Sequence, residues 1–249
     1  MVVAVDTEAL SENKPEGDDR VAAHLTCHVA IFTIMDGELS LLLTERNQGP
    51  FRFQWELPGL TPQPEEELEI AARRSYIALL NTNSAVEIHQ LGAYGDPARD
   101  PRHRAVAVVY WGVVNDTELG EALRNKPSEI RLIPFSESTS DGFRFAFDHA
   151  RIATDALNAL RRSLAHTSTA TRLCKAEFTI SDLLHIYEVV FDTKVSAGNF
   201  HRKVLNTPGF VEPVGEQPRN PKKKGRPAQY FRAPDLAEVL PPFDFKSGR

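Results

Sequence analysis

The chain has 249 residues, of which 41% are hydrophobic and 25% charged, and its formal net charge is −5. These values are typical of a soluble globular protein with one large domain or two ordinary ones. No apolar run approaches the roughly 20 residues that a membrane-spanning helix needs, so we expect no membrane partner.

The N-terminal residues 1–20 lack a basic region followed by an apolar core, which a secretory signal requires. We expect a disordered polar tail there. The two cysteines, Cys27 and Cys174, lie far apart in the sequence. They favour a reducing cytoplasm over a disulfide scaffold, with each thiol a small buried hydrophobe.

Charge is distributed unevenly along the chain. Residues 167–249 contain 13 Lys and Arg against 9 Asp and Glu, a net charge of +4, whereas residues 1–166 contain 16 against 25, a net charge of −9. This division predicts that a polyanion binds only the second part.

Strand patterns dominate the first part. Leu25–Met35 and Glu38–Thr44 are rich in apolar and β-branched residues, and Asp36-Gly37 between them is a strong hairpin signal. Further strands are predicted at Ala85–Tyr94 and at Ala105–Val114, the latter buried on both faces. The segments Glu118–Arg124 and Phe147–Leu164 have helical periodicity.

The most informative stretch is Trp55–Thr82. It predicts the end of a strand, a tight Pro58-Gly59 turn, an acidic loop and then a helix. Apolar residues recur at spacings of three and four from Leu68 to Leu80, and Glu65–Glu67 precede them, where carboxylates complement the helix dipole. A weak Mg²⁺ site on these carboxylates is the alternative, but the dipole explanation suffices.

This stretch resembles the signature of the Nudix hydrolases, G-x5-E-x7-R-E-U-x-E-E-x-G-U, in which U is aliphatic. Gly59, Glu65 and Arg73 stand at the matching positions, and the entry W-E-L-P-G is typical of the family. The family's catalytic glutamate is replaced by Arg74, and its metal-binding glutamate pair by Ile77 and Ala78. Metal-dependent hydrolysis needs those carboxylates, so the resemblance implies the family's α/β/α sandwich without its activity, a bound metal or a required cofactor.

An arginine-rich loop, residues 95–104, lies between two predicted strands and contains Arg99, Arg102 and Arg104. Its spacing alone favours a solvated loop with local ion pairs. Guanidinium groups also pair bidentately with phosphate, and Nudix proteins that act on ADP-ribose carry a similar R-D-P-R loop near the ligand. The resemblance therefore implies a nucleotide-binding site. Its candidate residues are Arg46, Glu65, Arg73, Arg74, Arg99, Arg102 and Arg104.

The second part begins after the helix Phe147–Leu164, which we expect to pack between domains or across a dimer. Simple packing in the core of the first domain is the alternative, and the sequence does not separate them. Ser181–Phe191 is a short amphipathic helix, and Ser196 is positioned to cap a second helix, AGNFHRKVLN. Burial of Phe200 and Val204 in that helix would leave its polar residues on another face. Asparagine, arginine and lysine suit base edges and phosphates, so the pair is a helix-turn-helix candidate.

A basic hairpin follows, with strands predicted at Gly209–Val214 and Ala228–Ala233. This order is that of a winged helix, in which basic loops neutralise phosphates. A solvated loop and a surface histidine at His201 are the simpler interpretations. The candidate DNA-binding residues are Asn199, His201, Arg202, Lys203, Arg219, Lys222, Lys223, Lys224 and Arg226.

The run N-F-H-R-K-V also resembles the N-F-R-R-K motif of Nudix-related transcriptional regulators, the NrtR family, with His201 in place of an arginine. The resemblance implies a Nudix-like domain over residues 21–166 and a winged helix-turn-helix domain over residues 167–249. It implies a homodimeric repressor of NAD synthesis and salvage genes that binds double-stranded operator DNA and responds to ADP-ribose or a related nucleotide. Such a protein is cytoplasmic and joins the nucleoid when bound to DNA.

Two alternatives remain open. One is an active ADP-ribose pyrophosphatase with an accessory domain, which the replaced carboxylates disfavour. The other is an interaction module whose basic loop binds an acidic protein.

Overall fold

The structure is a computed structural model that describes residues 22–82, 86–124, 126–216, 229–234, 238–240 and 242–243. The predicted tail over residues 1–20 lies outside the described residues. So do the predicted basic-loop residues Arg219, Lys222, Lys223, Lys224 and Arg226.

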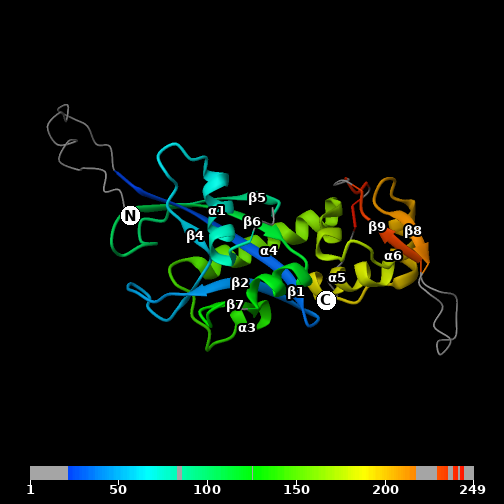
Figure 1. Cartoon of the computed structure of the whole chain (residues 1–249), viewed down its shortest axis with the longest axis horizontal. Helices are drawn as coiled ribbons and strands as arrows, with labels where there is room; N and C mark the ends of the chain where they lie inside the picture. The colour runs from blue at the N-terminus through cyan, green and yellow to red at the C-terminus, as the bar shows by residue number, and fades with distance from the viewer. Residues whose placement is uncertain are drawn as a thin grey trace.

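The first domain is built on a mixed sheet of seven strands (Figure 1). The main path runs β3-β2-β1-β6-β5, while β4 pairs with β1 and β7 pairs with β2. Only the β1–β6 pair in this sheet is parallel among the described strands. The strands are β1 (His24–Met35), β2 (Glu38–Glu45), β3 (Trp55–Glu56), β4 (Gly59–Leu60), β5 (Ile88–Tyr94), β6 (Ala105–Val113) and β7 (Ile130–Pro134).

Helices cover both faces of this sheet. On one face, α1 (Leu68–Leu80) and α2 (Asp116–Leu123) pack over alternate β1 residues such as Cys27 and Val29. On the other, α4 (His149–His166) packs over Ala30 and Phe32. Successive residues of a strand face opposite sides of the sheet, so β1 contributes side chains to both hydrophobic cores. The predicted α/β/α sandwich is confirmed.

The local predictions in this domain are largely confirmed. Asp36 and Gly37 have φ angles of 53° and 81°, as a two-residue hairpin turn requires. The predicted helices appear as α1, α2 and α4, although α2 begins two residues earlier than expected because Asn115 caps it and accepts a hydrogen bond from the Glu118 amide. Both cysteines are buried and free, as expected.

One local expectation is wrong, and two elements of the structure have no counterpart among the predictions. The Pro58-Gly59 turn is wrong, because Gly59 lies in β4 and pairs with His28. The strand β7 and the short helix α3 (Phe135–Ser138) were not predicted, since their apolar residues are too few to establish a period.

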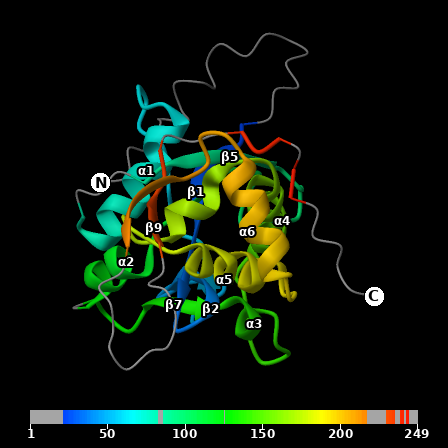
Figure 2. The same cartoon turned by 90° about the vertical axis from the view of Figure 1, so that its right-hand side faces the viewer.

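The second domain is a winged helix (Figure 2). Its helices are α5 (Ile180–Phe191) and α6 (Ala197–Asn206), and its hairpin pairs β8 (Glu212–Glu216) with β9 (Gln229–Arg232). Thr179 and Asp182 form a reciprocal capping box at the start of α5. The first wing strand starts three residues later than predicted, after a turn in which Gly209 has a φ of +70°.

The joint between the domains is packed. Ser168–Leu173 forms a 3-10 helix, most of whose side chains are buried. The helix α4 belongs to a hydrophobic cluster that continues through Leu183 and Tyr187 of α5 into the second domain. This placement fulfils the first alternative for α4, packing between domains. Packing across a dimer and the boundary at residue 167 stay predictions.

None of the helices in the described part of the chain is long and apolar enough to cross a membrane.

Candidate functional site

Two of the predicted arginines meet around one aromatic ring at the N-terminus of α4. The guanidinium of Arg46 lies 4.7 Å from the centroid of the Phe147 ring, and that of Arg102 lies 5.8 Å from it. Phe147 has a φ of +52°, an uncommon backbone conformation for a phenylalanine. Strained backbone of this kind costs about 1 kcal/mol or more and is common at ligand sites.

The three arginines of the loop 95–104 already donate hydrogen bonds to carboxylates or backbone carbonyls of the same chain. Arg99 forms a two-bond pair with Asp148, at 2.8 and 3.1 Å, and only 4% of its side chain is exposed. Arg102 forms a similar pair with Asp100, which lowers the pKa of Asp100 to about 2. Arg104 donates to the Gly95 carbonyl at 2.6 Å. A phosphate that binds this cluster therefore has to compete with internal acceptors.

Arg46 also has an acidic partner, Glu56, which lies in the W-E-L-P-G entry. Arg46 donates to the Glu56 carboxylate and, at 2.9 Å, to the Pro50 carbonyl. Burial raises the pKa of Glu56, while Arg46 and Arg102 oppose that rise. Arg46, Arg99 and Arg102 thus lie near the start of α4, and each of them pairs with a carboxylate.

The candidates on α1 lie across the sheet from this cluster. Arg73 donates to Glu69 and to the Val86 carbonyl, and Arg74 forms a two-bond pair with Glu66. That pair lowers the pKa of Glu66 to about 2. Glu65 is exposed to solvent at the start of this helix. The structure therefore divides the predicted ligand residues into two groups, and their roles stay predictions.

Two buried histidines adjoin the arginine cluster, and sequence reasoning did not single them out. The rings of His28 and His149 lie 4.9 Å apart. Burial lowers the pKa of His28 to about 4 and that of His149 well below its usual range. The lowered pKa values leave both rings neutral near pH 7, and the Nδ1 atom of His149 accordingly accepts a hydrogen bond from the Leu57 amide at 3.0 Å.

No three His, Cys, Asp or Glu side chains within the described ranges are arranged so that they could hold a metal ion.

The candidate nucleic-acid interface lies on α6. Phe200 and Val204 are buried, as predicted, while Asn199, His201 and Arg202 are exposed and Lys203 is half-buried. Arg202 donates to the Asn199 side chain at 3.1 Å, one turn away. Ser196 takes the predicted N-cap position, but its side chain makes no capping hydrogen bond. Instead the Glu188 carboxylate accepts from the Val195 amide at 3.0 Å and holds the turn before α6.

A C-terminal residue supports the underside of this helix. The Phe243 ring lies 5.4 Å from the ring of Phe200 and 5.0 Å from that of Tyr187, and its backbone amide donates to Ala165 at the end of α4. The Lys203 ammonium lies 5.5 Å from the centroid of the same ring. Phe243 therefore connects α4, α5 and α6. Its position follows from no local pattern in the sequence.

Comparison with protein families identifies both domains. Residues 25–153 match the model of the NUDIX domain, and residues 170–233 match the model of the NrtR DNA-binding winged helix domain. The two matches occur in the order in which the two folds occur in the structure.

Three similar proteins align with this chain over most of their own length. The chain is 25% identical to the ADPR responsive transcriptional repressor NtrR of Acinetobacter baylyi over 210 residues, which cover 84% of this chain and 81% of the relative. NrtR of Shewanella oneidensis, solved with a 27mer DNA, is 23% identical, with a TM-score of 0.75 over 88% of this chain and 99% of its own. A MutT/nudix family protein from Enterococcus faecalis is 18% identical, with a TM-score of 0.69 over 92% of both chains. The two structural matches establish the shared fold.

Proposed function

The chain belongs to the Nudix family, whose domain covers more than half of it, and carries an NrtR-type winged helix; from this premise we propose that it is a transcriptional repressor that senses ADP-ribose or a related nucleotide. The observation that carries the proposal is the exposed face of α6, where Asn199, His201 and Arg202 stand clear of the protein core. Side chains of this kind bind phosphates and base edges in a major groove. The Acinetobacter relative, a repressor that responds to ADPR, supports the same function.

The effector would bind at the N-terminus of α4. Arg46, Arg99 and Arg102 offer guanidinium groups to a diphosphate, and Phe147 offers an aromatic face between two of them. Phosphate competes well for guanidinium groups because it accepts the same paired hydrogen bonds as a carboxylate. ADP-ribose combines a diphosphate with ring systems, so its chemistry suits this mixture of charge and aromatic surface.

We infer that this domain binds the nucleotide without hydrolysing it. Magnesium in Nudix enzymes needs oxygen ligands on the helix that corresponds to α1. Here Arg74 pairs with Glu66, and Ile77 and Ala78 present exposed apolar side chains. These residues do not fit a hydrolytic metal centre. Incubation with ADP-ribose and Mg²⁺ should release no AMP, and metal-dependent release by pure protein would establish the pyrophosphatase instead.

We further propose that the protein regulates genes of NAD synthesis and salvage, that it is a homodimer and that it is cytoplasmic. A dimer would bind symmetric half-sites about 34–36 Å apart, or a multiple of that distance. If six side chains met phosphates, the slope of log affinity against log salt would be about −5.

The test is a DNA-binding titration on promoter fragments of NAD-synthesis genes, with and without ADP-ribose. Specific binding that ADP-ribose weakens would support both parts of the proposal. Specific binding that is indifferent to ADP-ribose would reject this effector, and the absence of specific binding would reject the repressor.

A further inference from the structure

One helix, α4, joins the candidate effector site to the winged helix. Its first residue, His149, follows directly on Asp148, and its last turn lies against the second domain. Ile152, Ala156, Leu160 and Leu164 are fully buried along its length. A helix held in this way moves as a rigid unit, so a change at one end is felt at the other.

At the N-terminus of α4, the Asp148 carboxylate pairs with Arg99 and does not cap the helix. Asp148 occupies the N-cap position of α4, yet its side chain makes no capping hydrogen bond. Its carboxylate, 18% exposed, accepts two hydrogen bonds from Arg99 instead. An aspartate at an N-cap ordinarily accepts from the amides of the first turn. The Asp148 side chain therefore has two alternative sets of donors, and the Arg99 pair now holds it.

At the other end, α4 is hydrogen-bonded to α5, the helix that precedes α6. The Nε atom of Arg161 donates to the Val190 carbonyl at 2.9 Å, in the last turn of α5. The Tyr187 hydroxyl donates to the Leu164 carbonyl at the same distance. Glu188, also in α5, accepts hydrogen bonds from two residues of the following turn, from Lys194 at 3.1 Å and from the Val195 amide. Hydrogen bonds thus lead from α4 to the start of α6.

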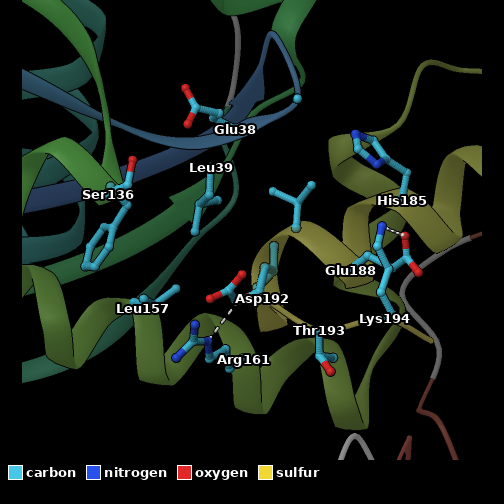
Figure 3. Close-up of a pocket in the computed structure, with 14 residues that line it drawn as sticks. Glu38, Leu39, Ser136, Leu157, Arg161, His185, Glu188, Asp192, Thr193 and Lys194 are labelled. Carbon is cyan, nitrogen blue, oxygen red and sulfur yellow. Dashed lines mark hydrogen bonds and ion pairs between the residues drawn. The ribbon is translucent and has the colours of Figure 1, made fainter. Parts of the chain in front are cut away.

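A cavity of about 640 Å³ lies beside this connection (Figure 3). Its upper wall in the figure is the β1–β2 hairpin with Glu38 and Leu39, and its lower wall is α4 with Leu157 and Arg161. The side chains of α5 and the following turn complete it. On this side the hairpin and the turn before α6 are not packed tightly together. The winged helix therefore has room to shift relative to the sheet while Arg161 keeps it attached to α4.

We propose that Asp148 and Arg99 are the switch through which the effector acts, and that α4 transmits its state to α6 through Arg161. This inference rests on the proposed function. A diphosphate that captures Arg99 leaves a largely buried carboxylate without its cation, which is costly. The Asp148 carboxylate then turns to the amides of α4, the helix resets, and α5 and α6 move with it. The ligand favours one arrangement because only that arrangement offers it a free guanidinium group.

The experiment compares the full-length wild type with Asp148→Asn, Arg161→Gln and a matched control, Arg162→Gln. Arg162 is the next residue on α4 and is exposed. ADP-ribose affinity is measured by calorimetry. Coupling is measured as the ratio of DNA Kd with and without saturating ADP-ribose, on the promoter duplex that the wild type binds best. Hydrogen exchange over residues 188–206 reports the response of the turn and of α6 without any DNA.

In the wild type and in Arg162→Gln, ADP-ribose should raise the DNA Kd at least about 10-fold and alter exchange at α6, since allosteric coupling is typically 5–150-fold. Asp148→Asn should bind ADP-ribose more tightly, because Arg99 is released from its anion, and its coupling should fall below about 3-fold. Arg161→Gln should bind both ligands but likewise lose coupling and the exchange response.

Wild-type coupling in both variants would overturn the relay and leave the repressor intact. Loss of coupling in Arg162→Gln as well would also overturn it, since general weakening of α4 would then explain the effect. If Asp148→Asn fails to fold, Arg161→Gln decides alone. A wild type that ignores ADP-ribose would instead reject the proposed effector.

Discussion

The cationic side chains of the two domains differ in what they already bind. In the first domain Arg46, Arg99 and Arg102 are each engaged by a carboxylate of the same chain. On α6 the Arg202 guanidinium is exposed to solvent and donates to the neutral side chain of Asn199. A nucleotide must therefore exchange partners inside the first domain, which links its binding to a structural change. DNA meets charges that are already presented, which favours rapid association steered by long-range attraction.

The largest effect should come from the support beneath α6. Phe243→Ala removes a ring that contacts Tyr187 and Phe200, and loss of a buried phenylalanine ordinarily costs about 3–5 kcal/mol. Urea unfolding followed by circular dichroism should show this loss. Leu240→Ala, three residues earlier and 67% exposed, is the control and should change stability by less than about 0.5 kcal/mol. Equal midpoints for the two variants would show that the Phe243 ring does not stabilise the folded protein.

The positively charged side chains of α6 should give the next effect. Arg202→Ala with Lys203→Ala should weaken DNA binding by about 2–4 kcal/mol and reduce the salt slope by about 2, because each side chain is assigned about one phosphate contact. Arg162→Ala with Lys175→Ala removes the same charge from exposed positions outside α6. Salt titrations of both double variants check this prediction. If the two double variants weaken DNA binding equally, net charge determines the affinity and the position of the charges on α6 does not.

The buried histidines predict a pH dependence for the first domain. The pKa of His28 is lowered to about 4 in the folded protein, so below its ordinary value of 6.5 the unfolded chain binds the extra proton. Stability therefore falls as pH falls from about 6.5 towards 4, by about 2 kcal/mol between pH 7 and pH 5 for this group. His149 acts in the same direction.

The variant His28→Gln removes the titrating group while keeping a polar side chain of similar reach. It should make the curve of unfolding free energy against pH shallower over that interval, with the contribution of His149 remaining. A curve that keeps its wild-type slope would assign the acid sensitivity to other groups.

The smallest effect separates the two groups of arginines. Arg46→Gln should weaken ADP-ribose binding by about 1.5–2 kcal/mol, the lower part of the range for hydrogen bonds to charged groups. Arg73→Gln, whose side chain pairs with Glu69 on the other side of the sheet, should change it by less than about 0.5 kcal/mol. Calorimetry on the two variants tests the division. The reverse order would place the nucleotide along α1.

Much of the fold was predictable because its signals are local. The Asp36-Gly37 hairpin, the apolar periods of α1 and α5 and the burial of Phe200 and Val204 each depend on residues close together in sequence. The sequence also singles out Arg99, Arg102 and Arg104 in a loop between strands, and their role in ligand binding stays a prediction. The partner of Arg99 was not predictable, because Asp148 pairs with it across 49 residues and no spacing rule reaches that far. Phe147 and His149 escaped notice for the same reason.

Gly59, the first residue of the Nudix-like signature, is required by the packing of the sheet. A Cβ atom at this position would lie 2.1 Å from Nδ1 of His28, so any larger residue would drive a wedge between β4 and β1. The first residue of the Nudix signature is thus required here by an imidazole ring on the neighbouring strand. The close approach of β4 to β1 is enough to require a glycine at this position. The presence of Gly59 is therefore no evidence for hydrolytic activity.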